Sequence, residues 1–189
     1  MKGKRMVSLE EGQEISEAEY EDLYGHARNS GIWYATNLPK TTHELKRKLY
    51  EKGYPEGPVY VRRDGGIEEV NIVDSAVASL VDALFVDDLL IAERYAETRR
   101  AARYGPSKVA RDLRFRGIED EDVEATIAEV YEGESPLPEL VELVERTLAQ
   151  ELKSSDDLWR LRRRVLQKAV TRGWDMGEAG AVLEELLDQ

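Results

Sequence analysis

Arginine and lysine side chains gather in three segments of the chain, and they offer the clearest chemistry in the sequence. Residues 40–52 hold five bases and two acids, residues 94–116 hold eight and two, and residues 160–172 hold six and none. Cations grouped in this way bind nucleic-acid phosphates or acidic protein surfaces. The spacing therefore indicates a cationic strip that recurs along the chain and binds an anionic partner.

In two of these segments, named bases lie opposite the apolar face of the expected helix. On 107–116 these are Lys108, Arg111 and Arg114, which fall on the side away from Val109 and Leu113. On 158–172 they are Arg160, Arg163 and Arg164. The alternative is that these helices pair with acidic helices and form a balanced, solvated surface. The candidate binding residues are Lys46, Arg47, Arg99, Arg100, Arg103, Lys108, Arg111, Arg114, Arg160, Arg163 and Arg164.

Catalytic and metal-binding patterns are absent from the sequence or have a structural explanation. Asp87-Asp88 and residues 119–122 are candidate carboxylate ligands, but acids at helix starts are ordinary caps. His26 and His43 have no partner at a metal-binding spacing, and the chain has no Cys, no phosphate loop and no nucleophile elbow. We therefore expect no enzymatic activity, no metal and no cofactor.

The acidic residues are also sorted into segments. The formal net charge is −12, with seven acids and no base in residues 8–24, and twelve acids against one base in residues 117–151. This charge opposes tight binding to free DNA, because the phosphate backbone attracts cations. Since no secretion signal and no run of about 20 apolar residues is present, we expect a soluble, cytoplasmic, monomeric protein with no membrane partner.

Helix signals dominate the elements that must position these bases. Ser16 with Glu19 and Thr41 with Glu44 match capping boxes, and Pro106 after Gly105 suits a first helical turn. Apolar residues recur at steps of three and four, which is the period of a helix with one buried face. Trp33, Trp159 and Trp174 fall at apolar positions or at helix ends that an apolar residue would close. We therefore expect their side chains to pack in the core.

Residues 59–72 depart from the helical pattern. The segment is β-branched around Asp64-Gly65-Gly66, which predicts a small β-hairpin with Gly65-Gly66 as the turn and Val61 opposite Val70. The same register sets Arg63 opposite Glu68 and Arg62 opposite Glu69. A disordered loop is the alternative.

Three ten-residue windows repeat without gaps at residues 45–54, 109–118 and 165–174. Each has apolar residues at its first and fifth positions, and each ends with a base, a glycine and a large apolar residue. Glycine ends a helix in the left-handed conformation, the next apolar residue seals that end, and the base meets the helix dipole. The windows therefore indicate an internal repeat of three helices, with chance similarity of helix ends as the alternative.

The expected fold is all-α, with three tandem three-helix repeats in an elongated, curved array and a small hairpin inserted in the first. The predicted divisions are a flexible segment at 1–15, repeat 1 at 16–86 with the insertion at 57–72, repeat 2 at 87–133 and repeat 3 at 134–189.

One continuous stretch resembles a known family. Residues 85–100 and 105–118 contain Val-Asp-Asp-Leu-Leu-Ile-Ala, an arginine-rich helix, Gly-Pro and Leu-Arg-Phe-Arg-Gly-Ile. This order is similar to the pattern of the RecX family of bacterial RecA regulators, and residues 42–54 resemble the family's first repeat. The sequence departs from the pattern at Leu90 and Ile91, and the insertion at 57–71 is unusual for the family.

The resemblance implies a non-enzymatic modulator that binds in the groove of the RecA–DNA filament. It implies inhibition of recombinase, ATPase and coprotease activity, and so a role in DNA repair, recombination and the SOS response. RecA and single- or double-stranded DNA are the implied partners. Two alternatives remain: a direct DNA-binding regulator that uses residues 87–104 and 107–116, and a helical scaffold unrelated to RecA.

Overall fold

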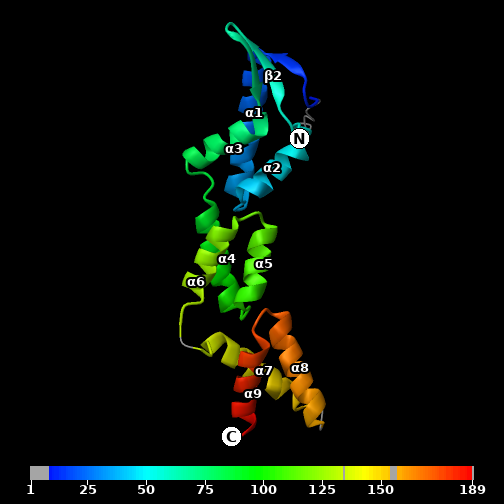
Figure 1. Ribbon diagram of the computed structural model, residues 1–189, viewed down its shortest axis with the longest axis vertical. Helices are drawn as coiled ribbons and strands as arrows, with labels where there is room; N and C mark the ends of the chain where they lie inside the picture. Colours follow the sequence, from blue (N-terminus) through cyan, green and yellow to red (C-terminus); the bar gives the residue numbers. More distant parts are fainter. Residues whose placement is uncertain (1–8, 134, 154–156, 189) are drawn as a thin grey trace. The chain divides into compact units, whose positions relative to one another are not determined.

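The computed structural model describes residues 9–133, 135–153 and 157–188, and most of these residues form α-helices (Figure 1). The chain divides into two compact units, with the division between Ile91 and Ala92. The prediction of a helical fold with a small hairpin is confirmed. Residues 1–8, which make up half of the segment predicted to be flexible, lie outside the described residues.

Three helices form most of the first unit, and their starts follow the capping signals of the sequence. Ser16 Oγ accepts a hydrogen bond from the Glu19 amide at 3.3 Å, and Thr41 Oγ1 accepts one from the Glu44 amide at 3.2 Å. The two glutamates bond back to the amides of the capping residues. The helices are α1 (Glu17–Asn37), α2 (Thr42–Tyr50) and α3 (Ile72–Asp82).

A three-stranded sheet completes this unit. Strand β2 (Val59–Arg63) pairs in parallel with β1 (Glu14–Ser16) and antiparallel with β3 (Gly66–Val70). Strand β1 lies partly inside the segment predicted to be flexible. Its central residue Ile15 is only 5% exposed, so burial of this apolar side chain holds the segment on the sheet.

The predicted hairpin exists, but its predicted register is wrong by two residues. Val70 lies opposite Val59 instead of Val61, because the turn consists of Asp64 and Gly65 instead of two glycines. Asp-Gly is among the most favoured two-residue hairpin turns. A shift of two residues leaves every side chain on the same face, so Val59 and Val61 are both buried as an alternating strand requires.

The charge pairs of the hairpin follow from this register. Arg63 still forms a salt bridge with Glu68, at 3.2 Å. Arg62, however, pairs with Glu14 on the neighbouring strand β1 and not with Glu69. The sequence did not indicate that third strand, so the partner of Arg62 was not predictable from the hairpin alone.

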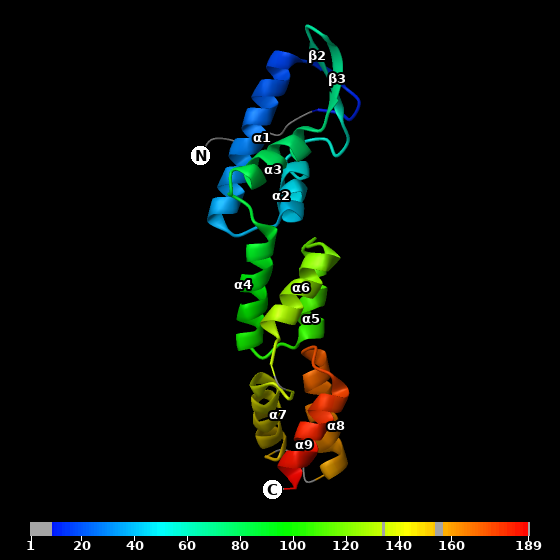
Figure 2. The ribbon, with the colours of Figure 1, turned by 60° about the vertical axis from the view of Figure 1, so that its left-hand side comes forward.

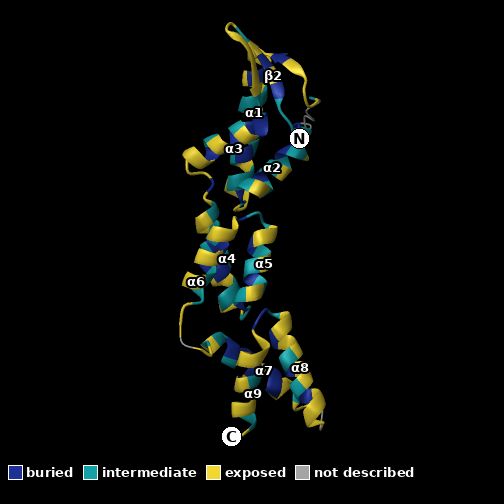
Figure 3. Cartoon of the chain, in the orientation of Figure 1, coloured by how far each residue is buried: buried dark blue, intermediate teal, exposed yellow. Residues whose placement is uncertain are grey.

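The core of the first unit is built from one face of each element. Leu45 and Leu49 of α2 are fully buried with Val73 and Leu80 of α3, and the inward valines of β2 pack against them. Figure 3 shows buried stripes along the helices, with exposed residues on their opposite sides. Ser79 of α3 accepts a hydrogen bond from Arg28 of α1 at 2.9 Å, which joins the two helices at the edge of this core.

Helices are the only regular secondary structure in the described residues of the second unit. Two clusters of buried apolar side chains lie within it: one around Val109 and Leu113, the other around Leu140, Leu161 and Leu183. Its helices are α4 (Asp88–Ala101, which begins in the first unit), α5 (Pro106–Phe115), α6 (Asp120–Val130), α7 (Pro138–Glu151), α8 (Leu158–Thr171) and α9 (Met176–Leu187), as Figures 1 and 2 show. No helix in the described ranges is long and apolar enough to cross a membrane.

The middle helices α2, α5 and α8 end in the same way. After each comes a glycine in the left-handed region, with φ of 94° at Gly53, 79° at Gly117 and 90° at Gly173. The following residue donates its amide to the carbonyl five residues earlier and buries its side chain in each case. These apolar residues are Tyr54, Ile118 and Trp174. The three windows of the sequence therefore share one local structure, and the exact boundaries of the three repeats stay a proposal.

A backbone-to-backbone joint connects the end of α8 to the start of α5. The Gly105 amide donates to the Arg172 carbonyl at 2.8 Å, and the Ser107 amide donates to the Gly173 carbonyl at 3.3 Å. The indole of Trp174 donates to the Arg103 carbonyl at 3.0 Å. The joint fixes the end of α8 beside the turn between α4 and α5.

Candidate interface for an anionic partner

Arg99 lies between two tyrosine rings. Its guanidinium carbon is 4.9 Å from the ring centroid of Tyr95, one turn earlier on α4, and 5.2 Å from that of Tyr104, just beyond the helix end. The electron-rich ring faces attract the cation. Hydrogen bonding to Tyr95 also raises the pKa of Arg99, so the side chain stays charged.

The same alternation continues on both sides of Arg99. The guanidinium carbon of Arg116, at the end of α5, is 5.3 Å from the Tyr95 centroid. That of Arg172, at the end of α8, is 4.9 Å from the Tyr104 centroid. Arg116, Tyr95, Arg99, Tyr104 and Arg172 therefore form an alternating row, which we call the arginine–tyrosine ladder.

Hydrogen bonds made by two of its members hold the ladder in place. Arg172 Nη1 donates to the Ala102 carbonyl at 2.8 Å, and the Tyr95 hydroxyl donates to Asp112 Oδ2 at 3.1 Å. The joint between Gly105 and the end of α8 keeps Arg172 beside Tyr104. Side chains ordered before binding lose less conformational entropy when a ligand arrives.

The ladder is suited to binding phosphate or carboxylate groups. A guanidinium presents a planar fork of donors that matches two oxygens of such an anion. Arg99 and Arg172 form no salt bridge with any carboxylate in the described part of the chain. Asp112 lies near enough to raise the pKa of Arg99 further, but neither guanidinium is held in an ion pair by a described residue, so both can bind an external anion.

The bases predicted on α2 form ion pairs within the first unit. Lys46 Nζ is 2.8 Å from Asp74 of α3, and Arg47 Nε is 3.9 Å from Glu51. Both pairs are substantially exposed, and such pairs contribute little to stability. Lys46 and Arg47 stay candidates for binding, but each already has an acidic neighbour.

Two of the bases predicted on and after α4 connect this helix to α7. Arg100 Nε donates to Glu139 at 2.8 Å, and its Nη1 donates to the Val130 carbonyl. Arg103 forms a salt bridge with Glu142, and this hydrogen bond lowers the pKa of the Glu142 carboxyl and raises the pKa of Arg103. These two arginines therefore act first as ties between helices, as the balanced-surface alternative predicts.

The three bases predicted on α5 differ from one another. Lys108 forms a salt bridge with Asp112, and Arg114 Nε donates to Asp120 of α6 at 2.6 Å. Arg111 is exposed, and its side chain has no partner among the residues that the structure describes. Binding of a partner by Arg111 would therefore break no salt bridge or hydrogen bond of its side chain among the described residues.

The bases predicted on α8 lie on its solvent-facing side. Arg160 Nε is 3.2 Å from Asp157, and Arg164 Nη1 donates to Glu151 of α7 at 2.8 Å. The guanidinium carbon of Arg163 is 5.6 Å from the ring centroid of Trp159. Thus Arg163 makes the same kind of contact as the ladder arginines, but with an exposed tryptophan.

Sequence reasoning missed four members of the ladder. These are Tyr95, Tyr104, Arg116 and Arg172. The two arginines precede the glycine in the repeated windows, and a base at that position was attributed only to its interaction with the helix dipole. Lys52, the corresponding base of the first window, lies 5.9 Å from the ring of Tyr34. All three pre-glycine bases thus contact a tyrosine, and this repetition was the available signal.

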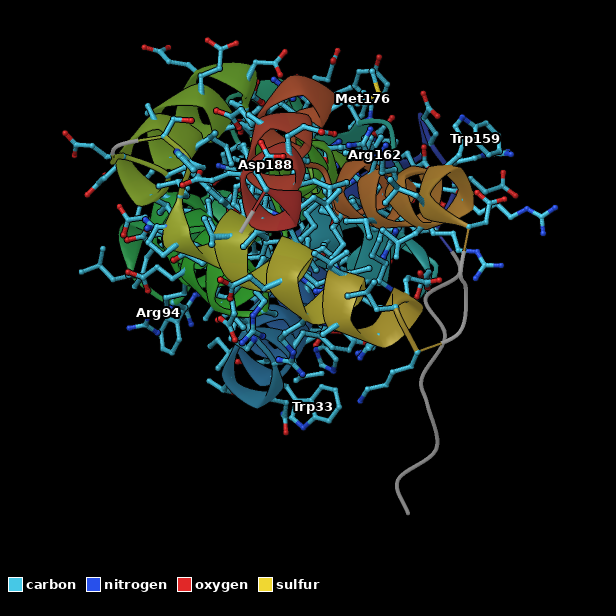
Figure 4. The ribbon with its side chains drawn as sticks, turned by 90° about the horizontal axis from the view of Figure 1, so that it is seen from below. Trp33, Arg94, Trp159, Arg162, Met176 and Asp188 are labelled. Carbon is cyan, nitrogen blue, oxygen red and sulfur yellow. The ribbon has the colours of Figure 1, made fainter. Side chains whose placement is uncertain are left out.

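The prediction for the tryptophans is correct for Trp174 and wrong for the other two. Trp174 is 4% exposed, whereas Trp33 and Trp159 are 61% and 67% exposed. Figure 4 shows the side chains of Trp33 and Trp159 projecting from their helices. Trp33 lines a shallow pocket with Lys52 and neighbouring residues of α1. Tryptophan is usually buried, but no element among the described residues covers either of these two rings.

The candidate carboxylates have structural roles at helix starts. Asp87 accepts a hydrogen bond from the Leu90 amide at 2.9 Å, and Asp88 accepts bonds from the amide and hydroxyl of Thr42 at 2.9 and 2.6 Å. The acids from 119 to 122 lie at the start of α6. Across residues 9–133, 135–153 and 157–188, no group of three potential ligands gathers as a metal site would require.

Comparison with known proteins gives one consistent result. Residues 87–127 match the family description "RecX, second three-helix domain". The chain is similar to "Regulatory protein RecX" of Leuconostoc mesenteroides, with 24% identity over 181 residues that cover 93% of this chain and 60% of that protein. It is also 26% identical to the Thermobifida fusca protein of the same name, over 89% of this chain and 82% of the relative. The chain is therefore similar to RecX proteins over most of its length.

A solved structure has the same fold as this chain. The crystal structure of RecX from Lactobacillus salivarius matches 89% of this chain and 99% of its own, with a TM-score of 0.71 and 19% identity. The match of residues 87–127 contains Tyr95, Arg99, Tyr104 and Arg116, which places four of the five ladder residues in the second three-helix domain. The chain spans 60% of the length of the Leuconostoc relative.

Proposed function

We propose that this chain is a RecX protein, and that it binds the RecA–DNA filament and limits its recombinase, ATPase and coprotease activities. The family supports a regulatory role, and the arginine–tyrosine ladder is the observation that supports an anionic partner. Its guanidiniums bind phosphates of the DNA or carboxylates of RecA along the filament groove. The bound chain then hinders strand entry or subunit exchange without any catalytic step.

The exposed bases of α8 extend this proposal. Arg160 and Arg163 are exposed, and residues 158–172 contain no acid. We propose that they contact the same filament as the ladder. The proposed setting is the cytoplasm, where a monomer acts on RecA during recombination, DNA repair and the SOS response.

The test is the single-strand-DNA-dependent ATPase rate of RecA, measured with this chain at well below one molecule per RecA. A lower rate at such ratios is the expected result, because a regulator bound in the groove affects several subunits. A higher rate would identify a helper in place of an inhibitor, and no change even at excess would overturn the proposal.

Variants connect the effect to the ladder. Changing Arg99, Arg116 and Arg172 together to Gln should raise the concentration needed for half-maximal effect at least about tenfold. The matched control changes three arginines on β2, α4 and α7 for which the described residues provide no tyrosine-ring contact: Arg62, Arg94 and Arg146. Both variants lose three charges, so only the ladder variant should lose activity while circular dichroism shows unchanged helicity in both.

Direct binding to DNA is a second candidate function, and the ladder favours it too. Binding through phosphates would weaken steeply as salt rises, because each contact releases counterions. The net charge of −12 opposes this mode at long range. Affinity for bare DNA that equals the affinity for the filament would favour direct binding, whereas much weaker affinity for bare DNA would favour the filament.

A further inference from the structure

Trp159 is a large aromatic side chain that the core does not use. It lies in the first turn of α8, is 67% exposed, and projects outward from the helix in Figure 4. The buried face of α8 is formed by Leu161, Val165 and Ala169. An exposed indole keeps a wide apolar face in water, so its burial by a ligand is favourable.

Arg163 orders the indole from one side. Its guanidinium lies one helical turn beyond Trp159, with its central carbon 5.6 Å from the ring centroid. Positions four residues apart face each other on a helix, and tryptophan is the best partner for such a cation. The pair is therefore a preformed platform in which a cation and a flat ring face solvent together.

The surroundings of this platform are cationic. Arg160 is exposed, and its salt bridge with Asp157 is open to solvent, where such pairs contribute little. Residues 158–172 carry six bases and no acid in a chain of net charge −12. Arg162 and Arg164 pair with Glu184 and Glu151, so the cations nearest the indole are Arg163 and, where its exposed salt bridge opens, Arg160. These two cations favour a ligand that carries negative charge as well as a flat face for the indole.

Single-stranded nucleic acid has both properties in a regular pattern. Its unpaired bases stack on aromatic side chains, and its phosphates bind the neighbouring cations. In a duplex the base faces are stacked on each other and are not available. An acidic protein segment would satisfy Arg160 and Arg163 but would leave the indole face of Trp159 without a matching surface.

We propose that Trp159 stacks on an unpaired base of single-stranded DNA while Arg160 and Arg163 bind the adjacent phosphates. This inference rests on the proposed function, because it specifies the form of DNA that the α8 surface contacts. It assigns a separate task to each surface: the ladder binds charge, whereas the α8 platform distinguishes unpaired from paired bases.

The test compares two labelled oligonucleotides of equal length and charge, oligothymidine and its abasic counterpart, by fluorescence anisotropy at low salt. Trp159→Ala in the full chain should weaken oligothymidine binding about tenfold, the scale of one base stacked on an aromatic ring. The abasic affinity should stay unchanged. Trp159→Phe, which keeps a ring, should recover part of the loss, and Trp33→Ala removes an equally exposed indole from the first unit as the matched control.

Several results would overturn the stacking site. These are no binding of oligothymidine by the wild-type chain, an unchanged affinity in Trp159→Ala, or equal losses for both oligonucleotides. Competition by polyglutamate as strong as that by unlabelled oligothymidine would assign the surface to an acidic protein segment. Any of these results with RecA ATPase still lowered would leave the proposed function in place. Trp159-dependent binding without an effect on RecA would instead overturn the proposed function alone.

Discussion

Leu84, just beyond α3, adopts the backbone conformation that Gly53 adopts just beyond α2. Their φ angles are 58° and 94°, and in both cases the next residue donates its amide to the carbonyl five residues earlier. Glycine takes this left-handed conformation without penalty, whereas a residue with a Cβ is strained in it by about 1–2 kcal/mol. The Leu84 side chain is also 85% exposed, so its packing contributes little free energy to offset this backbone strain.

We therefore predict that Leu84→Gly stabilises the chain. Relief of the left-handed strain outweighs the extra backbone entropy of glycine in the unfolded state, for a net gain of about 0.5 kcal/mol. Urea denaturation followed by circular dichroism measures this gain as a higher midpoint. Leu84→Ala keeps the Cβ and removes the rest of the side chain, so it should leave the midpoint unchanged. Equal gains in both variants would show that the exposed leucine side chain, and not the backbone, is unfavourable.

Local signals explain why much of the fold was predictable. Gly53, Gly117 and Gly173 each end a helix because the hydrogen bonds of that motif involve only a few consecutive residues. The capping boxes at Ser16 and Thr41 are local in the same sense. The predicted register of the hairpin was wrong because Asp64-Gly65 and Gly65-Gly66 are both acceptable turns. The sequence pattern also gave no indication of strand β1.

The candidate interface was less predictable because it depends on contacts between distant residues. Arg172 meets Tyr104 across 68 residues of sequence, and Arg100 meets Glu139 across 39. The sequence shows that these arginines lie in basic segments, but it cannot show which neighbouring helix each one meets. It therefore grouped Arg99 with Arg100, although the first belongs to the ladder and the second ties α4 to α7.

The joint between α5 and α8 depends on close contact between two backbones. A Cβ added at Gly105 would lie 2.5 Å from the carbonyl carbon and oxygen of Gly173. The φ of Gly105 is −83°, which any residue adopts, so the cost of a side chain there is steric. We predict that Gly105→Ala destabilises the chain by about 1–3 kcal/mol, the usual cost of overpacking.

Gly180 is the matched control for this prediction. It lies inside α9, and a Cβ added there would meet no atom within 4 Å. Gly180→Ala should stabilise the chain by up to about 1 kcal/mol, because alanine is the better helix former. Thermal unfolding of the two variants should shift in opposite directions. A neutral Gly105→Ala would show that the joint can open without loss of stability.

The salt bridge between Arg103 and Glu142 predicts a dependence of stability on pH. The hydrogen bond from Arg103 lowers the pKa of Glu142 below its ordinary value of 4.5. The folded chain therefore binds this proton less readily than the unfolded chain, and the bridge stabilises the fold above pH 4.5. This contribution is lost as the pH falls from 4.5 through the lower pKa of the folded state.

Glu142→Gln should therefore be less stable than the wild type at neutral pH, with the difference shrinking as the pH falls below 4.5. Urea midpoints measured across this range give the difference directly. Glu145→Gln, on the same helix and without a salt bridge in the described ranges, should differ from the wild type by a constant amount. A difference for Glu142→Gln that does not change with pH would mean that the bridge contributes no stability.

Substitutions at Tyr104 separate the effect of ordering the arginine side chains of the ladder from the effect of their charge. Its ring contacts Arg99 on one side and Arg172 on the other. Tyr104→Leu leaves every cation in place but removes the surface that orders two of them, so the affinity for the RecA–DNA filament should fall severalfold. The salt dependence of binding should stay the same, because the number of phosphate contacts does not change.

Arg172→Gln should give the opposite pattern, since it removes one charge and lowers the slope of log affinity against log salt by about one. Tyr104→Phe is the control, because it keeps the ring face and should bind as the wild type does. Filament-binding isotherms at four or five salt concentrations separate these cases. If Tyr104→Leu binds as tightly as Tyr104→Phe, the tyrosine rings do not organise the cations, and the ladder acts only through its net charge.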